Sequence, residues 1–583
     1  MTQGHALAAP SIPLDRPAER ACNRVTQGDA ARGGGMSGAT FDYVIAGGGS
    51  AGATLASRLS EDPAVRVCLL EAGGGGDHIL IRAPMGAVGL VPGRGKLCNW
   101  AYRTVPQPEL NGRRGFQPRG KALGGSSAIN AMLYVRGHRS DYDGWADLGC
   151  DGWSWDDCLP YFLRSEGNEN GADSFHGGDG PLQVSNQKHA RPITRAFIEA
   201  ATTCQHREVA DFNTGENEGA GLYQVTQFHS GPRRGERCSA AAAYLFPVRA
   251  ARPNLTIVTG AHANRILMDG KRAVGVEYRK GRATLTARAR REVIVAAGAF
   301  NSPQLLLLSG IGPAEELARH GIAVVHDLPG VGKNLQDHLD FIMAYTSRDT
   351  DNFGIGFRAA LNMLGHVRQW RKDRAGMVST CFAEGAAFLK TDPALDRPDI
   401  QLHFVIGIVD DHARKLHYGH GFSCHVCALR PYSRGEVFLQ SADPRAAPGI
   451  DPRYLSDPRD LQTTIKGAKM MRQILQAPAM AKYRHKELFG LRDGMSDADW
   501  ERHIRARADT IYHPVGTCKM GIDDMAVVDP SLQVRGVEGL RVVDASVMPT
   551  LIGGNTNAPT IMIAERAADL IRGFEAPARI AAE

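Results

Sequence analysis

The segment IYHPVGTCKMG, residues 511–521, places a histidine five residues before a cysteine. These residue types can bind a metal ion, or His513 can activate the Cys518 thiol as a nucleophile. A nucleophilic pair also needs an orienting third group and an acyl substrate, and the sequence indicates neither. His513 alone can serve as an acid–base group, because the ordinary pKa of histidine, about 6.5, lies near neutrality. A buried histidine with a structural role is the remaining interpretation.

A glycine-rich turn near residue 50 has the spacing of a dinucleotide-binding site. The apolar run FDYVIA precedes the turn GGGSAG, and an amphipathic segment and a second apolar run ending at Glu71 follow it. This order predicts a strand, a turn, a helix and a strand. Gly47, Gly49 and Gly52 have the G-x-G-x-x-G spacing that allows a tight turn, the approach of a pyrophosphate and close helix–strand packing. Glu71 lies where an acid binds the ribose hydroxyls of adenosine.

Two later segments favour FAD over a nicotinamide cofactor. Residues 291–312 and 539–571 each predict an apolar strand, a loop of small residues and a helix, far from the first unit. A cofactor domain assembled from distant pieces, with another domain inserted between them, is typical of large flavoproteins. Compact nicotinamide-binding domains lack such insertions, so we expect FAD.

These elements require a large α/β protein. A chain of 583 residues is too long for one core and should form two or more domains. A hydrophobic fraction of 43%, a charged fraction of 22% and a mean hydropathy of −0.25 exclude a disordered, collagen-like or multi-spanning membrane protein. The 67 glycines come in clusters, which predicts that the backbone approaches a ligand closely in several places.

The net charge and the cysteines limit the partners and the compartment. A net charge of +6 without a dominant Lys/Arg block gives no indication of a nucleic-acid partner. Eleven cysteines without framework spacing fit a reducing compartment, so we expect a cytoplasmic protein. The sequence contains no run of 18 apolar residues, so we predict no transmembrane helix. Residues 1–40 lack a signal-peptide core and are expected to form a disordered tail, with Met36 as an alternative natural start.

Residues 403–427 have the composition of a metal site but not its spacing. They contain five histidines, two cysteines and two aspartates. Cys424 and Cys427 would point to opposite faces of a strand, and no second pair closes a tetrahedron, so we predict no metal site. The preferred interpretation is a strand followed along the chain by a histidine-bearing loop, in which His412 or His417 lines the substrate entrance.

Residues 353–372 predict an amphipathic helix with a basic end. Docking of its apolar stripe against the rest of the protein is the preferred interpretation, and contact with an anionic membrane surface is the alternative. The apolar residues at helical spacing are Phe357, Leu361, Leu364, Val367 and Trp370, and the basic residues are Arg358, Arg368, Arg371 and Lys372.

Several longer motifs together resemble the glucose-methanol-choline (GMC) oxidoreductase family, from about residue 41 to residue 571. They are most similar to its choline-dehydrogenase-like bacterial alcohol dehydrogenases, such as the enzymes of alkane and polyethylene glycol oxidation. The motifs are RGKALGGSSAINAMLYVRGHRSDYDGW (119–145), LPGVGKNLQDHLD (328–340), SRGEVFLQSADP (433–444), IYHPVGTCKMG and GGNTNAPTIMIAE.

The resemblance implies an α/β fold, in which a Rossmann-like FAD-binding domain carries an inserted α+β substrate-binding domain with an antiparallel sheet. It assigns residues 41–155, 235–345 and 505–575 to a discontinuous FAD-binding domain. Residues 156–234 and 346–504 are then the substrate-binding domain.

The resemblance also implies FAD as the cofactor. Some family members attach FAD through a histidine, but the matching position here is Ile129, so we expect non-covalent FAD. The expected cofactor contacts are Gly47, Gly49, Ser50, Ala51, Gly52, Glu71, Ala72, Gly124, Gly125, Ser126, Asn130, Ala297, Gly298, Asp544, Ala545, Asn555 and Thr556.

The activity implied by the resemblance is FAD-dependent oxidation of a primary alcohol to the aldehyde. Hydride passes to flavin N5, His513 is the base, Asn557 orients the substrate oxygen and Cys518 is a packed thiol. The electrons are expected to pass to a quinone or another acceptor that is not oxygen, and peripheral contact with the inner membrane stays open. The alternatives are an oxygen-using alcohol oxidase, a choline, sorbose or polyol dehydrogenase, and a redox-neutral flavoprotein similar to hydroxynitrile lyases. The sequence does not indicate the oligomeric state.

Overall fold

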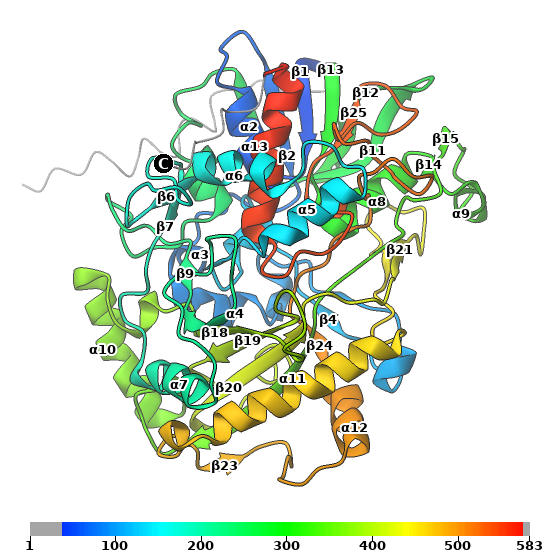
Figure 1. Cartoon of the computed structure of the whole chain (residues 1–583). Helices are drawn as coiled ribbons and strands as arrows, with labels where there is room; N and C mark the ends of the chain where they lie inside the picture. Colours follow the sequence, from blue (N-terminus) through cyan, green and yellow to red (C-terminus); the bar gives the residue numbers. More distant parts are fainter. Residues whose placement is uncertain (1–37, 575–583) are drawn as a thin grey trace, which may run out of the picture.

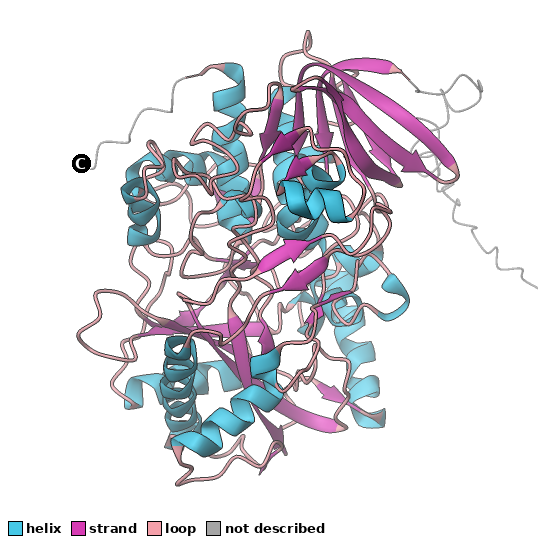
Figure 2. Ribbon diagram, turned by 90° about the vertical axis from the view of Figure 1, so that its right-hand side faces the viewer, coloured by secondary structure: helices cyan, strands magenta, loops and turns pink. Residues whose placement is uncertain are grey.

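Two large β-sheets organise the molecule, one in the upper and one in the lower half of Figure 1. The computed structural model describes residues 38–574, so the tail expected at residues 1–40 lies almost entirely outside the described residues. Figure 2 shows the two groups of strands with loops and short helices between them. Within the described part of the chain, every helix is too short or too polar to span a lipid bilayer.

The seven-stranded sheet carries the glycine-rich turn. Its order is β10–β2–β1–β13–β12–β11, with β25 beside β13. The first four strands and β25 are parallel, whereas β12 and β11 add antiparallel pairs. The strands are β1 (Ala39–Ala46), β2 (Val67–Glu71), β10 (Leu255–Thr259), β11 (Ala261–Asp269), β12 (Arg272–Lys280), β13 (Ala283–Val295) and β25 (Leu540–Val542). The run VCLLE of β2 is wholly buried, as parallel strands covered on both faces require.

A buried glutamate joins three helices on this sheet, α2 (Ser50–Leu59), α6 (Trp155–Ser165) and α13 (Asn557–Arg572). Glu565 of α13 accepts hydrogen bonds from Arg58 of α2 and Arg164 of α6, each at 2.9 Å. The Tyr244 hydroxyl donates to the same carboxylate at 2.7 Å. Two cations and a hydroxyl compensate the buried charge, so α2 and α13 are held side by side with their N-termini at the same end.

The eight-stranded sheet is antiparallel throughout. Its order is β23–β16–β20–β19–β18–β8, with β17 beside β20 and β24 beside β16. The strands are β8 (Gly219–Leu222), β16 (Leu339–Ser347), β17 (Gly354–Ile355), β18 (Ala383–Leu389), β19 (Ile400–Val405), β20 (Gly419–Ala428), β23 (Lys486–Glu487) and β24 (Asp509–Thr510). Helices α7 (Pro192–Thr203) and α11 (Pro458–Gln476) pack against it.

This pair of sheets confirms the predicted fold class, a Rossmann-like domain with an inserted antiparallel sheet. The placement of two strands differs from the expected boundaries. β16 and β24 belong to the antiparallel sheet, although boundaries at 345/346 and 504/505 assign both to the FAD-binding domain. The reason is that the β20 ladder continues through β16 to β24.

Shorter elements connect the two sheets. The remaining helices are α3 (Ile79–Arg82), α4 (Ala87–Leu90), α5 (Arg139–Asp147), α8 (Gly298–Leu308), α9 (Ala314–Arg319), α10 (Phe357–Asp373) and α12 (Asp497–Arg507). The short strand pairs are β3 (Tyr102–Arg103) with β4 (Phe116–Gln117), β5 (Leu133–Tyr134) with β9 (Gln224–Val225), β6 (Glu166–Asn168) with β7 (Leu182–Val184), β14 (Ile311–Gly312) with β15 (His326–Asp327), and β21 (Glu436–Phe438) with β22 (Gly449–Asp451).

The predicted amphipathic helix exists as α10, but its apolar stripe does not dock as expected. Trp370 is the single buried residue of the helix. Phe357, Leu361 and Leu364 are 81%, 53% and 59% exposed. Helical periodicity identifies a stripe, but it does not show what covers that stripe, and the described chain leaves these three side chains open.

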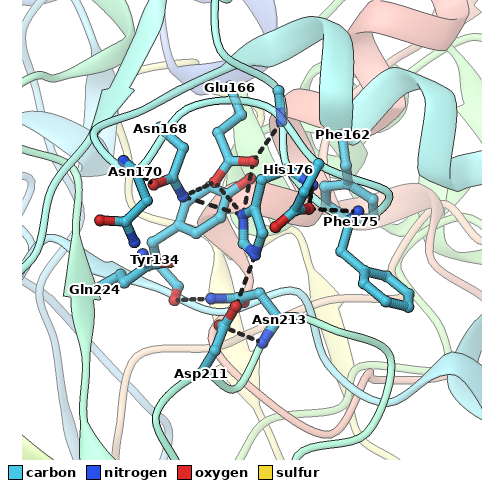
Figure 3. A network of polar contacts seen from close by, with 12 residues as sticks. Tyr134, Phe162, Glu166, Asn168, Asn170, Phe175, His176, Asp211, Asn213 and Gln224 are labelled. Carbon is cyan, nitrogen blue, oxygen red and sulfur yellow. Dashed lines mark hydrogen bonds and ion pairs between the residues drawn. The ribbon is translucent and has the colours of Figure 1, made fainter.

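A buried polar network anchors β5, whose Leu133 lines the cavity described below. Figure 3 shows His176 between Glu166 and Asp211. The imidazole lies 2.6 Å from Asp211 Oδ2 and 3.1 Å from Glu166 Oε2, and Arg136 donates to the same Glu166 oxygen at 2.6 Å. Burial alone lowers the pKa of His176, but the hydrogen bonds to Asp211 and Glu166 outweigh it and raise the pKa to about 9.

This network predicts a pH-dependent contribution to stability. The folded pKa of His176 lies above the ordinary value, so its contribution is complete below about pH 6.5 and is lost as the pH rises through about 9. His176→Gln should lower the free energy of unfolding by about 2 kcal/mol at pH 6, the size typical of hydrogen bonds to charged groups. The difference should shrink above pH 9. Denaturant unfolding measures it, with His320→Gln as a control, and a pH-independent difference would contradict the assignment.

Candidate active site

One large cavity, with a volume of about 390 Å³, lies between the two sheets and is lined from both. The glycine-rich turn, the N-terminus of α13 and the loop containing His513 contribute to one wall, and β19 and β20 contribute His403 and His425 to another. All expected cofactor residues except Gly52 and Gly124 line this cavity, as do His513 and Asn557. Fold and cavity thus bring together residues that are up to about 500 positions apart in sequence.

The three glycines of the turn have different physical roles. A Cβ at Gly47, where φ is +113°, would lie 2.4 Å from the Ala296 carbonyl oxygen, and one at Gly52 would lie 1.9 Å from the Gly47 oxygen. Both positions therefore exclude side chains because backbone packs against them. A Cβ at Gly49 would meet nothing closer than 3.9 Å. Space is thus left beside Gly49, at the N-terminus of α2, which no side chain caps. Free N–H groups in that position favour a phosphate.

The acid that ends β2 holds the turn and faces the cavity. Glu71 Oε2 accepts the Gly48 N–H at 2.9 Å, and Oε1 accepts the Gly73 N–H at 2.6 Å. Burial raises the pKa of Glu71 to about 7, against these N–H bonds, which lower it. Gly124 donates its N–H to the Gly48 oxygen at 2.8 Å, so the second glycine-rich loop, GGSS, is tied to the first. Each carboxylate oxygen keeps a lone pair for a ribose hydroxyl.

Asp544 and Asn130 also line the cavity while bonding to protein. Asp544 Oδ2 accepts from the Gly298 N–H at 2.8 Å and from the Ser302 hydroxyl at 2.5 Å. These bonds fix the start of α8 at the cavity wall. The Asn130 amide oxygen accepts from the buried Arg237 guanidinium at 2.8 Å, so this oxygen orients its loop.

The loop that carries His513 is held in a strained conformation. Tyr512 has a φ of +78°, a left-handed value that bulky residues rarely adopt. Its N–H donates to the Thr510 hydroxyl at 2.7 Å, and the His513 N–H donates to Asp337 Oδ1 at 2.8 Å. Asp337 is itself held by the Thr510 hydroxyl at 2.6 Å. The His513 ring lines the cavity, and the contacts of its two nitrogens with His338 at 2.9 Å and with the Asn555 amide at 3.0 Å fix its orientation.

The proton positions on His513 follow from its neighbours. His338 Nε2 lies 2.9 Å from the Leu429 carbonyl oxygen, which can only accept, so His338 carries its proton on Nε2. Its Nδ1 is then an acceptor for the Nδ1–H of His513, 2.9 Å away. His513 Nε2 is left unprotonated and accepts from the Asn555 amide at 3.0 Å. The Leu429 carbonyl thus sets the proton positions of both rings, and the unprotonated His513 Nε2 faces Asn555.

Electrostatics supports two neutral imidazoles. Burial lowers the pKa of His338 to about 4. Burial and the neighbouring groups His338, His403 and Arg119 hold the pKa of His513 well below its ordinary value. A neutral His513 is the form that can accept a proton, so the site rests in its basic state at neutral pH.

The amide that contacts His513 Nε2 belongs to Asn555. Asn557 lines the same cavity, and its assignment as the residue that orients the substrate oxygen stays a prediction. The Asn557 amide oxygen accepts from the Ser50 hydroxyl at 2.7 Å, in the glycine-rich turn. Asn557 is the first residue of α13, and its side chain turns back toward α2, whereas Asn555 lies in the preceding loop.

A line of hydrogen bonds continues from Asn555 into β19. The Gln401 amide donates to Asn555 Oδ1 at 3.2 Å and to the Tyr223 oxygen at 2.8 Å. The Tyr223 hydroxyl then donates to His403 Nδ1 at 2.7 Å. Burial lowers the pKa of His403 to about 3, so this imidazole is neutral. Asn555 is therefore oriented from both sides, with its N–H groups toward His513.

Cys518 does not pair with His513. It is fully buried, it lies outside the cavity lining, and its N–H donates to the Ser546 oxygen at 2.9 Å. Burial raises the pKa of its thiol well above the ordinary value. The ten cysteines of residues 38–574 are all unpaired, and one of them, Cys381, lines the cavity.

His338 and His403 were not identified from the sequence as functional residues. His412 or His417 was expected to line the substrate entrance, and one of these two lines the cavity. His412 lines the cavity and bonds to the Tyr512 hydroxyl at 2.7 Å. His417 is not in the cavity lining and lies 2.9 Å from Asp410 Oδ2. The stretch LPGVGKNLQDHLD held the signal for His338, since an aspartate and a histidine end a loop directly before a strand. No local signal indicated His403.

Comparisons with known proteins show what the chain is similar to. Residues 41–340 match the N-terminal family model of GMC oxidoreductase, and residues 431–564 match the C-terminal model. The chain is 47% identical to an alcohol dehydrogenase [acceptor] of Pseudomonas putida over 91% of this chain and 95% of the relative. It is 44% identical to an oxygen-dependent choline dehydrogenase of Paraburkholderia xenovorans (strain LB400), over 93% and 96%.

Solved structures give the same picture. Pyridoxine 4-oxidase from Mesorbium loti superposes with a TM-score of 0.81 at 33% identity, over 92% of this chain and all of that one. A variant of the Aspergillus oryzae formate oxidase, solved to follow modification of its FAD, superposes with a TM-score of 0.84 at 28% identity, over 92% and 99%.

Alanine replacements at Asn555 and Asn557 should have different effects. Asn555→Ala removes the amide beside His513, so reduction of bound FAD by an alcohol should slow roughly 100-fold while FAD stays bound. Asn557→Ala removes a bond within the glycine-rich turn, so it should weaken FAD retention with little change in the rate per bound FAD. Stopped-flow absorbance and the visible spectrum after gel filtration measure the two effects. The same defect in both variants would contradict the assignment.

His338→Phe tests the proton positions. Phenylalanine keeps the ring volume but cannot accept the His513 Nδ1–H, so the reduction of bound FAD by an alcohol should slow by about 10- to 100-fold. His338→Gln, whose amide oxygen can accept the same N–H, is the matched control and should recover much of the rate. If both variants lose equal activity, His338 only fills space.

Proposed function

Because the chain belongs to the GMC oxidoreductase family, whose members use FAD, we propose that it oxidises a primary aliphatic alcohol to the aldehyde. His513 serves as the base, and the electrons pass to a quinone or another acceptor that is not oxygen. The observation that carries the proposal is the contact of 3.0 Å between His513 Nε2 and the Asn555 amide in the wall of the cavity that the glycine-rich turn also lines.

The residues present fit FAD. Space beside Gly49 at the start of α2 suits the pyrophosphate, and Glu71 suits the adenosine ribose. The N-terminus of α13, which no side chain caps, lies near Asn555 and favours negative charge on a flavin ring. Ile129 offers no atom for covalent attachment, which supports non-covalent FAD. When bound, FAD supplies the acceptor for two electrons and the hydrogen from the carbinol carbon.

The protein's own part is to hold the alcohol and to take its proton. The alcohol hydroxyl displaces the Asn555 N–H from the single lone pair of His513 Nε2 and donates to that nitrogen, and the alcohol oxygen accepts an N–H of the Asn555 amide. As the carbinol C–H bond breaks, His513 takes the hydroxyl proton and Asn555 stabilises negative charge on the oxygen. The chain of bonds through His338 and Gln401 keeps both groups in place during the reaction.

The cavity lining favours a neutral alcohol over choline. Glu71 and Asp544 are the acidic side chains that line it among the described residues, and both serve the cofactor side. A quaternary ammonium is stabilised by carboxylates and aromatic faces, and the described lining holds no third carboxylate for such a group. Apolar side chains are numerous in the lining, among them Val88, Val91, Phe382, Val405, Val409 and Ile511. An alkyl chain gains free energy by burial against such a surface.

The likeness to an alcohol dehydrogenase [acceptor] supports an acceptor other than oxygen. The ten unpaired cysteines support a reducing compartment, the cytoplasm. Choline oxidation is the second candidate, because choline dehydrogenases match nearly the whole chain.

A substrate series in the absence of oxygen tests the function. Octanol should bleach the visible band of bound FAD at a much higher kcat/KM than choline, sorbose or a polyethylene glycol, because only the alkyl chain matches the wall. His513→Ala should slow bleaching by about 10² to 10⁴, the usual share of a general base. Asp544 and Glu71 are unchanged in this variant, so its FAD content serves as the control.

Three results would contradict the proposal. Faster bleaching by choline would make choline the substrate. Rapid oxygen consumption with octanol, in place of reduction of a quinone analogue, would identify an oxidase. FAD that stays oxidised with every alcohol would favour a redox-neutral reaction.

A further inference from the structure

One side of α10 presents apolar side chains to solvent. Phe357, Leu361 and Leu364 are spaced by four and three residues, so they lie on one face of the helix, and each is more than half exposed. The opposite side is attached to the protein through Trp370, which is buried and donates its indole N–H to the Gly235 oxygen at 3.3 Å. Figure 1 shows α10 at the left edge of the molecule.

A neighbouring loop extends the apolar face. The β17–β20 ladder pairs Ile355 with Gly419, so Tyr418 follows opposite Gly356, beside the start of α10. Tyr418 is 81% exposed and Leu416 is 50% exposed. We call Phe357, Leu361, Leu364, Leu416 and Tyr418 the apolar patch. Several exposed apolar side chains on one helix face and on a loop beside its start are typical of an interaction surface.

Basic residues continue the same face of α10 toward its C-terminus. Arg368, Arg371 and Lys372 are exposed and follow Leu364 by four, seven and eight residues, so they lie in line with the apolar side chains. Arg358 is exposed at the other end, and Asp373 is the single acidic residue of the helix. The face therefore has an apolar half and a strongly positive half.

We propose that this face of α10, with Tyr418, docks on the surface of a bilayer that contains anionic lipids. Phenylalanine and leucine insert at the boundary of the acyl chains, tyrosine suits the headgroup level, and arginine and lysine bind anionic headgroups. The charge argues against a second copy as the occupant. Each copy of the helix carries four cations and one acidic residue, so a symmetric contact would offer these cations no complementary charge.

The position of the patch links docking to the cavity. The loop that ends at Tyr418 begins with Val409, His412 and Ala413, which line the cavity. The chain that leaves α10 reaches the cavity at Cys381–Ala383. Under the proposed function, which this step rests on, an alcohol or a quinone dissolved in the bilayer would enter between these two segments. Docking itself does not depend on which substrate is oxidised.

Sedimentation with lipid vesicles tests docking of the FAD-loaded enzyme. We expect binding to phosphatidylcholine vesicles that contain phosphatidylglycerol, weaker binding to pure phosphatidylcholine, and further weakening by salt. Leu361→Ser with Leu364→Ser, and separately Arg368→Glu with Lys372→Glu, should each lower the affinity about tenfold or more. Val324→Ser with Lys466→Glu changes an exposed apolar and an exposed basic residue elsewhere, and should bind as the parent does.

All these variants should keep the parent rate of octanol oxidation with a water-soluble dye, because no replaced residue lines the cavity. Docking would be overturned if the parent enzyme did not sediment with vesicles, or if the patch variants bound vesicles as tightly as the parent. The parent could instead be a dimer that does not bind vesicles and that the Leu361→Ser and Leu364→Ser changes convert to monomers. This result would show that the patch is a self-association surface and would also overturn docking. Vesicle binding without alcohol oxidation would leave docking standing and refute the proposed function alone.

Discussion

The hydrogen bond from His338 to the Leu429 carbonyl is the constraint on which the chemistry depends. A carbonyl oxygen cannot donate, so it dictates the tautomer of His338, and through His338 that of His513. Burial lowers the pKa of both rings, which favours their neutral forms. The proposed base is thus oriented by groups that lie outside the cavity lining. Gln401 gives Asn555 the corresponding orientation from the opposite side.

The contact between the two sheets brings the loops that carry the site residues together. Asp337 and His338 directly precede β16, and β24 directly precedes the His513 loop, so the β16–β24 pairing brings both loops to one place. The α2–α13 pair brings the glycine-rich turn to the same cavity, and Asn555 stands at the junction. Neither sheet alone contains the site. A change that loosens the contact between the sheets would therefore separate base from cofactor before it unfolded either half.

The fold class and the glycine-rich turn were predictable from the sequence because their signals are local, whereas the other expected cofactor contacts came from family likeness. Gly47, Gly49 and Gly52 act through the backbone of one turn, and apolar runs specify strands that are buried on both faces. His513 was identified through family likeness. The choice between Asn555 and Asn557 depends on where α13 begins, and the part played by His338 depends on a contact across 175 residues. The exposure of the apolar side chains of α10 could not be predicted either, because hydrophobic periodicity identifies a helix face but not what packs against it.

The state of the cysteines has a consequence for durability. Flavoenzymes that react even slowly with oxygen release hydrogen peroxide beside their own side chains, and peroxide attacks thiolates. Burial raises the pKa of Cys381, Cys424 and Cys427 well above the ordinary value, so these sulfurs stay protonated. Cys381 lies in the cavity wall itself. Because a protonated thiol reacts more slowly with peroxide than a thiolate, we expect this cavity wall to resist oxidation during long turnover.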